Sequence, residues 1–488
     1  MAISSVIATA NKSPGSYFEV ALGVGVASAG NAPRRVALVG QKLAAGTWTA
    51  NAPIPVFTEE DAIAGAGQGS ELHLMVRAAL RAYRGVTLFA VPLADPGGTA
   101  ADGDIVFSGA ATADGVYDIE VAGELVQVSV DSGDAAAVIA AAVASALNDL
   151  PDLPVTATVA VATVTVTAKQ TGTRGNNISL RSSGDIAGVT ETHHSGYLTG
   201  GVGTDTLTGA QAAMDPERYH LIGLAHDDAA SIQSWRDHVE DNAAPLEGKR
   251  QQIVAATKDT LANAITLATG VNAARAQIAW HYNADDAPSV VAAAVAATRA
   301  ELEGTDPAAP MSDVHGTVVR GLRPQPTVAD RPIQSELASA LDNGLTPISL
   351  DRAGRTYIHR SVTSRSQDSG GNPNYAVLDT AKVTVSDYVA DQLQVWWSGF
   401  VALNGKLAPD DADGNPPPPG VATPSTIKDG IYAELKALEP QMLTNVDEQL
   451  PNLVVEIASA PDGRVNALIP ADIVEGAYQL AAAVQQVG

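Results

Sequence analysis

The spacing of apolar residues in the first quarter of the chain predicts a strand, a helix and a second strand. Residues 35–39 (RVALV) and 86–91 (VTLFAV) are short apolar runs rich in valine, which is typical of buried strands. Between them, residues 70–84 carry apolar side chains at three- and four-residue spacing, which predicts an amphipathic helix with Ser70 as its N-cap. The alternation resumes later, with strands predicted at 218–225, 251–257 and 277–282 and helices at 227–240, 259–269 and 288–302. Alternation in units of this length predicts an α/β core with a mainly parallel sheet.

The stretch between these two regions has a different composition. From Gly85 to Ala168 there is no Lys or Arg, whereas 11 residues are Asp or Glu. Because the change starts at a Pro-Gly-Gly turn, residues 96–205 are predicted to form an inserted domain. Its predicted elements are a hairpin at 117–130 that turns near Gly123, an Ala-rich helix at 134–148 opened by Asp134, and strands at 155–168 and 177–181. These elements make a small α+β unit, and its acidic surface favours an exposed position on the outside.

Beyond residue 345 the pattern changes again. Residues 356–366 alternate like an antiparallel strand, 383–404 form a long amphipathic helix, and 415–420 (NPPPPG) form a rigid loop. The final run, EGAYQLAAAVQQV, fits a strand and a helix equally well. The predicted organisation is an N-terminal arm at 1–30, a core α/β domain at 31–95 and 206–345, the inserted domain at 96–205, a C-terminal α+β domain at 346–475 and a C-terminal arm at 476–488.

Charge and composition narrow the classes of partner. With 29 Lys and Arg against 54 Asp and Glu, the formal charge is −25, which argues against binding to nucleic acid or to an anionic membrane. The absence of cysteine excludes disulfides and thiolate metal sites. The N-terminus has no basic segment followed by a long apolar one, so no export signal or membrane anchor is predicted. Only 4% of residues are aromatic, so Ala and Val must fill much of the core.

Four arginines cluster in this anionic chain, and two tryptophans lie on the predicted long helix. The arginines are Arg352, Arg355, Arg360 and Arg365. We interpret them as partners of acidic residues, either within the molecule or across an interface between subunits. Trp396 and Trp397 are interpreted as core residues rather than as a platform for a ligand.

The candidates for catalytic or ligand-binding chemistry are weak. GAGQGS (65–70) superficially resembles a phosphate-binding loop, but it has no lysine and Glu71 would repel phosphate, so an ordinary helix-entry turn is the better interpretation. His193 and His194 lie near Glu191, yet adjacent residues of a strand point to opposite faces and cannot easily share a metal. His220 and His226 flank a predicted strand and fit strand-edge histidines. We therefore predict no catalytic residue, no cofactor and no metal, and the protein is not expected to be an enzyme.

Several segments resemble contractile tail sheath proteins of bacteriophages, most specifically those of Mu-type phages. The resemblance covers essentially the whole chain. The segments that carry it are SPGSYFEV (13–20), the helix and strand at 70–95, the insertion motifs VAGELVQVSV, SGDAAAVIAAAV, DLPVTATV and GTRGNNISLR within 115–181, GLRPQP (321–326), RAGRTYIHRSVTSR (352–365) and NYAVLDT (374–380).

The resemblance implies a structural subunit rather than an enzyme. Sheath proteins polymerise as stacked six-membered rings around a tail tube, and the sheath shortens to drive the tube through the bacterial envelope. The implied partners are further copies of the chain, the tail tube protein, and the baseplate and tail terminator proteins. The implied location is the virion tail, and the host cytoplasm during assembly. The alternatives are the sheath of a phage-derived injection device such as a bacteriocin and, from another class, an α/β hydrolase or a nucleotide-binding enzyme.

The two terminal segments are the predicted connections between subunits. A strand added to a neighbour's sheet gives main-chain hydrogen bonds that hold while rigid bodies move. The resemblance favours this role for both ends, and for the last segment it also favours a strand over a helix. The predicted arm residues are Tyr17, Phe18, Val20 and Leu22 at the N-terminus and Tyr478, Leu480, Ala482 and Val484 at the C-terminus.

Overall fold

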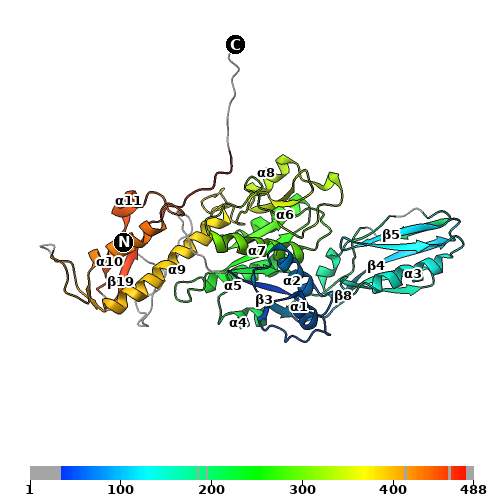
Figure 1. The fold of residues 1–488 in the computed structure, drawn as a ribbon, viewed down its shortest axis with the longest axis horizontal. Coiled ribbons are helices and arrows are strands. Elements are labelled where there is room, and N and C mark those ends of the chain that lie inside the picture. Colours follow the sequence, from blue (N-terminus) through cyan, green and yellow to red (C-terminus); the bar gives the residue numbers. More distant parts are fainter. Residues whose placement is uncertain (1–33, 184–185, 194–195, 412–414, 460–462, 480–488) are drawn as a thin grey trace, which may run out of the picture.

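A computed structural model describes residues 34–183, 186–193, 196–411, 415–459 and 463–479. The N-terminal arm residues, together with Leu480, Ala482 and Val484, lie outside the described residues. Figure 1 shows a central α/β core with a smaller unit at each end of the long axis. We call residues 96–205 the insert and the described residues from 380 onward the C-terminal part.

The core is built on one large, mainly parallel sheet, as the strand and helix alternation predicts. Its order is β15-β14-β13-β12-β11-β1-β3-β2. The six inner strands are parallel, and the two edge strands, β15 and β2, are antiparallel to their neighbours. The strands are β1 (Arg35–Gln41), β2 (Ile54–Val56), β3 (Thr87–Leu93), β11 (Leu221–Leu224), β12 (Gln252–Thr257), β13 (Ala276–Trp280), β14 (Leu345–Leu350) and β15 (Thr356–Ile358).

Helices cover both faces of this sheet, each with its own apolar cluster. One face packs against α1 (Glu59–Ala66), α2 (Glu71–Ala82) and α7 (Pro288–Thr305), and the other against α4 (Thr208–Met214), α5 (Ala229–Asn242), α6 (Leu261–Val271) and α8 (Gln334–Asp342). Alanines fill much of the first face, since residues 291–297 of α7 are all buried. The Oγ of Ser70 accepts a hydrogen bond from the backbone N–H of His73, which confirms Ser70 as the N-cap of α2.

The insert folds around a separate apolar cluster. A four-stranded sheet of order β10-β4-β8-β7 and a three-stranded sheet of order β6-β5-β9 both contact α3 (Ala136–Asn148). The strands are β4 (Ala100–Gly109), β5 (Gly115–Val121), β6 (Glu124–Val130), β7 (Val155–Ala160), β8 (Thr163–Thr171), β9 (Leu180–Ser183) and β10 (Val189–His193), and η1 (Thr173–Asn177) is a short 3-10 turn.

The sequence predictions for the insert need three corrections. Residues 155–168 are a hairpin and not one strand, because the chain turns at Val161, whose φ is 57°, without a glycine or proline to mark the turn. Strands β4 and β10 were not predicted. They pair with each other across about 80 residues of chain, which a local pattern cannot reveal. The N-cap of α3 is Ala135 rather than Asp134, which instead accepts a hydrogen bond from the N–H of Asp131.

The C-terminal part combines helices with two-stranded sheets. Its elements are α9 (Thr380–Leu403), β16 (Lys406–Leu407), β17 (Val421–Ala422), α10 (Pro424–Leu438), α11 (Val446–Gln449), β18 (Val454–Ile457) and β19 (Val465–Leu468). The prediction of a strand over 356–366 is wrong beyond Ile358. The following residues bond to loops and strand ends instead: the backbone N–H groups of Ser361, Thr363 and Ser364 donate to Met311, Leu378 and Ala276. The domain boundaries given above stay predictions.

Candidate functional site: the two ends of the parallel sheet

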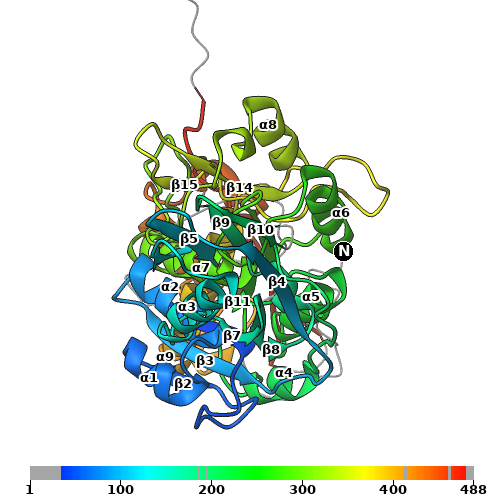
Figure 2. The same cartoon turned by 90° about the vertical axis from the view of Figure 1, so that its right-hand side faces the viewer.

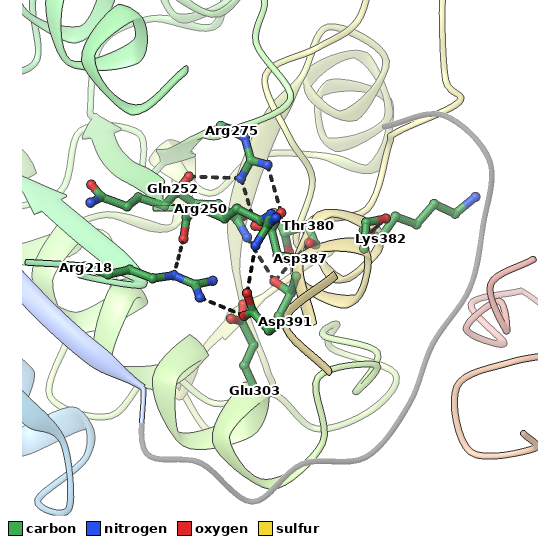
Figure 3. A network of polar contacts seen from close by, with 12 residues as sticks. Arg218, Arg250, Gln252, Arg275, Glu303, Thr380, Lys382, Asp387 and Asp391 are labelled. Atoms are coloured by element: carbon green, nitrogen blue, oxygen red, sulfur yellow. Dashed lines mark hydrogen bonds and ion pairs between the residues drawn. The ribbon is translucent and has the colours of Figure 1, made fainter. Parts of the chain in front are cut away.

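Three arginines mark the amino ends of three neighbouring parallel strands. Arg218, Arg250 and Arg275 lie shortly before β11, β12 and β13. Neighbouring parallel strands begin at the same edge of a sheet, so the three guanidinium groups come to one side of the core. Figure 3 shows them converging on the first half of α9.

Two carboxylates on α9 receive these arginines. Asp387 and Asp391 are four residues apart and therefore lie on the same side of the helix. Arg275 donates from Nη1 and Nη2 to the two oxygens of Asp387, both at 2.8 Å. Arg218 and Arg250 each donate to one oxygen of Asp391, at 2.7 and 2.9 Å. We call these five residues the arginine clamp.

The clamp is strongest where water is excluded. The side chains of Arg275 and Asp387 are only 6% and 4% exposed. Burial acts to raise the pKa of Asp387, but the charge and hydrogen bonds of Arg275 outweigh it, so this pKa lies below its ordinary value. Removing either partner would leave a buried charge without compensation, which is far more destabilising than losing a surface ion pair. The clamp therefore fixes α9 against the core.

Buried amide and hydroxyl groups extend the clamp into the core. Gln252 on β12 donates from Nε2 to the hydroxyl of Thr384 on α9 at 3.1 Å. Its Oε1 accepts from Nη2 of Arg299, which also donates to Gln277 and pairs with Glu303. One hydrogen-bonded network thus joins α7, two strands of the sheet and α9.

The second half of α9 has a different character. Residues 392–405 (QLQVWWSGFVALNG) contain no charged side chain. Trp396 and Trp397 are partly buried against the C-terminal apolar cluster, as expected for core residues, and Trp396 lies with its ring centroid 5.0 Å from that of Phe400. On the outer side of the helix, Val395 and Leu403 are 70% and 79% exposed. This gives an apolar outer surface, which we call the α9 face, in a chain that is otherwise acidic.

The four candidate interface arginines are not one cluster in the structure. Arg355 pairs with Asp351 four residues before it, at 2.8 Å, and Arg360 makes two hydrogen bonds to Asp379, at 2.8 and 3.0 Å. Arg352 is exposed and Arg365 is half-buried. Their role between subunits stays a prediction.

Tyr478 is the one predicted arm residue within the described part of the chain. Its ring lies under the guanidinium of Arg360, 4.0 Å from ring centroid to Cζ, and makes an edge contact with His315. Burial, and the nearby carboxylate of Asp379, raise the pKa of the phenol above its ordinary value. Tyr478 is thus held on its own chain, so a C-terminal arm would begin after it.

At the opposite edge of the sheet, the carboxyl ends of the strands face the insert (Figure 2). Lys258, just after β12, donates to the backbone carbonyls of Asn177 in the insert and Ala284 in the core. Burial lowers the pKa of Lys258 to about 7. Its ammonium lies 4.1 Å from the ring centroid of Tyr197, whose hydroxyl donates to Asn283. This joint is polar, in contrast to the apolar clusters on either side of it.

The weak candidates from the sequence have ordinary structural roles. The first two residues of GAGQGS end α1, and the other four form the entry turn of α2, with Gly67 and Gly69 at φ of 93° and 75°. Nδ1 of His220 accepts a hydrogen bond from the N–H of Arg35, and burial lowers the pKa of His220 to about 3. His226 bonds to Asp205 at 2.9 Å. Each of these two histidines lies near an end of β11 and has a hydrogen-bond partner.

Two further searches cover only the residues that the structure describes. No group of three or more His, Asp or Glu side chains there is arranged to hold a metal ion. No helix in that part is both long and apolar enough to cross a membrane.

The sequence analysis missed the arginine clamp, although one signal for it exists. Asp387 and Asp391 are the only charged residues in the predicted helix at 383–404, and they are spaced one helical turn apart. Two isolated carboxylates on one side of an apolar helix indicate buried cationic partners. Nothing local identifies those partners, because they precede Asp387 by more than 100 residues.

Comparisons with known proteins show which family the chain resembles. Residues 200–364, which span the second half of the core, match the model of the phage tail sheath protein central domain. Over 473 residues the chain is 26% identical to the Mu-like prophage FluMu tail sheath protein of Haemophilus influenzae, an alignment that covers 95% of this chain and 94% of that protein.

Two solved structures of sheath proteins match the chain over most of its length. One is a sheath tail protein from Listeria innocua, with 14% identity, a TM-score of 0.47 and coverage of 90% of this chain and 95% of that one. The other is the PVC sheath of an extracellular contractile injection system in its contracted state, with 12% identity, a TM-score of 0.46 and coverage of 98% and 99%. The sequence matches confirm the resemblance: residues 200–364 match the central domain of phage tail sheath proteins, and nearly the whole chain is similar to the tail sheath protein of a Mu-like prophage.

Proposed function

We propose that copies of this chain assemble through the C-terminal part into six-membered rings stacked around a tail tube, and that the resulting lattice shortens to drive the tube through a bacterial envelope. The observation that carries the proposal is the surface of the C-terminal part. It combines the apolar α9 face with the sheet formed by β18 and β19, which has only two strands within the described residues. The insert, at the other end of the long axis, is the proposed outer surface (Figure 1).

The α9 face suits contact with another copy of the chain. Isolated exposed valines and leucines are common on protein surfaces, but in this part of α9 three exposed apolar side chains, Val395, Val401 and Leu403, follow one another without an intervening charge. Two acidic subunits repel each other, and a contact surface without charge adds no further repulsion at close range. The α9 face provides such a surface.

The sheet formed by β18 and β19 suits strand addition. Within the described residues it has only two strands, and its end pair, Val454 and Leu468, is 43% and 50% exposed. Two-stranded sheets are marginally stable alone, and unpaired edges accept further strands. We propose that the arms of neighbouring copies, around 15–26 and after Tyr478, complete this sheet by β-augmentation.

Deletion of residues 1–26 tests the proposal. These residues precede the described core, so the variant should fold, remain soluble and lose the ability to form connected sheath. Negative-stain electron microscopy and analytical ultracentrifugation of the purified full chain and the variant provide the comparison. Hollow striated cylinders from the full chain and only small particles from the variant are expected. Cylinders of unchanged length from the variant would contradict the proposed arm.

A further inference from the structure

The strand order of the core creates a crevice at the carboxyl ends of β1 and β11. From β1 the chain crosses by α1 and α2 to β3 on one side, and from β11 it crosses by α5 to β12 on the other. The connections therefore leave in opposite directions between these two strands. In open α/β sheets this switch point is where ligands bind, because the loops diverge and leave a gap.

Here a side chain of the insert fills the gap. Nε of Arg174, in η1, donates to both oxygens of Glu71 at 2.9 and 3.0 Å, and Glu71 is the first residue of α2. Nη1 of Arg174 lies 2.6 Å from Asp205, the last residue of the insert, where the chain returns to the core. The side chains of Arg174, Glu71 and Asp205 are 10%, 11% and 1% exposed. A guanidinium group is thus enclosed between two carboxylates.

The two carboxylates are held in place by the core itself. Asp205 also accepts hydrogen bonds from Gln41, at the end of β1, and bonds to His226, just after β11. Glu71 accepts from the backbone N–H of Gln41 at 3.1 Å. Burial acts to lower the pKa of Arg174, yet Glu71 and Asp205 raise it above its ordinary value. Burial acts to raise the pKa of Asp205, yet His226 and Arg174 lower it. The receptor for the guanidinium group is therefore formed by both strands of the switch point.

We propose that the crevice at the switch point is a guanidinium-binding site whose ligand, Arg174, is supplied by the insert, and that this occupancy holds the insert at a fixed angle to the core. The covalent connections alone define the angle poorly, since they are two adjacent glycine-containing segments, paired between Thr99 and Val202. Arg77, Arg181 and Arg323 also form ion pairs between the insert and the core, but their side chains are 20–34% exposed, against 10% for Arg174. A planar group clamped from two sides removes that freedom. The inference concerns a single chain and does not depend on the proposed assembly.

The test measures the angle in the full-length protein and attempts a chemical rescue. The chain has no cysteine, so Ser132→Cys in the insert and Thr266→Cys on α6 give two exposed labelling sites in an otherwise unlabelled protein. Pulsed electron paramagnetic resonance then gives the distribution of distances between the two spin labels. Excess unlabelled chain is added so that distances between labels on different subunits do not contribute. We expect one narrow peak for the labelled protein that retains Arg174. The labelled Arg174→Ala variant should lose that peak and give a broadened distribution.

Ethylguanidinium at millimolar concentration should restore the narrow peak in Arg174→Ala, because it supplies the missing guanidinium group as a free molecule that is not attached to the protein. Tetramethylammonium at the same concentration should not, because it cannot donate hydrogen bonds. Arg320→Ala, which removes a solvent-exposed arginine paired with Glu301, is the matched control and should keep the peak. Hydrogen exchange in α3 and α7 checks that the insert and the core stay folded.

Two results would overturn the inference. A narrow, unshifted peak in Arg174→Ala would show that Arg174 does not hold the insert. A broadened distribution that ethylguanidinium leaves unchanged, in a variant whose α3 and α7 remain protected from exchange, would show that the crevice is not a guanidinium site. Arg174→Lys adds a third comparison: it keeps the charge but loses the planar fork, so a peak as narrow as that of arginine would also count against the assignment.

Discussion

The two ends of the central sheet are joined to their neighbouring units by different arrangements of charge. At the amino ends the core supplies the arginines and α9 supplies the carboxylates. At the carboxyl ends each side supplies both signs of charge. Arg174 and Arg181 of the insert pair with Glu71 and Asp285 of the core, whereas Asp152 and Glu124 of the insert pair with Arg77 and Arg323 of the core. Both joints bury ion pairs, and a larger difference between the two ends lies beyond the joints.

Beyond its joint, each unit presents a different surface. The α9 face is apolar and without charge. The outer side of the four-stranded sheet in the insert instead exposes carboxylates and hydroxyls, including Asp102, Asp104, Thr156 and Thr158. A surface of the first kind is stabilised by association, whereas a surface of the second kind is stable in water. This contrast supports assembly through the C-terminal part, with the insert facing solvent.

The largest expected effect comes from placing a charge on each surface. Leu403→Asp should abolish polymer formation, because the carboxylate would be buried without a partner in the proposed contact. Its matched control is Val161→Asp in the insert, where the native side chain is 85% exposed against 79% for Leu403. The control should polymerise normally, and aspartate is also tolerated at the positive φ of that turn. Sedimentation and electron microscopy measure both variants, and loss of polymer in Val161→Asp alone would reverse the proposed orientation.

A second prediction separates a buried joint from an exposed contact. Asp387→Asn should lower the free energy of unfolding by about 3–5 kcal/mol, because Arg275 would remain buried without its counter-charge. Asp104→Asn, which alters an exposed carboxylate bonded to Thr165, should change it by less than about 0.5 kcal/mol. Urea denaturation of both variants gives the comparison. Equal losses would mean that the arginine clamp contributes little to stability.

The third and smaller effect is a pH dependence of the free energy of unfolding, which arises at the amino ends of the strands. His220 has a folded-state pKa of about 3, lowered by burial and then by Arg218 and Arg34, against an ordinary value of 6.5, while Asp387 opposes the shift. Between these values the unfolded chain binds the proton and the folded chain does not. His220 therefore lowers stability as the pH falls below 6.5, by about 1.4 kcal/mol for each pH unit. His220→Asn, which keeps an acceptor for the N–H of Arg35, should flatten the stability curve between pH 6 and pH 4, and an unchanged slope in urea denaturation would exclude His220 as the cause.

Much of the core could be predicted from the sequence because its signals are local. The apolar runs of β1 and β3, the three- and four-residue spacing in α2 and the capping hydroxyl of Ser70 each lie within a few residues, and each appears in the structure as expected. The hairpin near Gly123 is predictable for the same reason, since glycine at positive φ marks the turn. The acidic stretch from Gly85 to Ala168, which has no Lys or Arg, likewise separates most of the insert from the core without any knowledge of its fold.

Only the tertiary structure decided how these pieces are joined. Arg275 and Asp387 are 112 residues apart, Arg174 and Glu71 are 103 apart, and β4 and β10 pair across the whole length of the insert. Whether a charged residue is a solvated surface group or half of a buried pair depends on which distant segment folds against it. The spacing of apolar and polar residues in one sequence does not indicate which segment that is. The sequence determined which elements form and where charge is concentrated, whereas long-range packing determined which of those charges became joints.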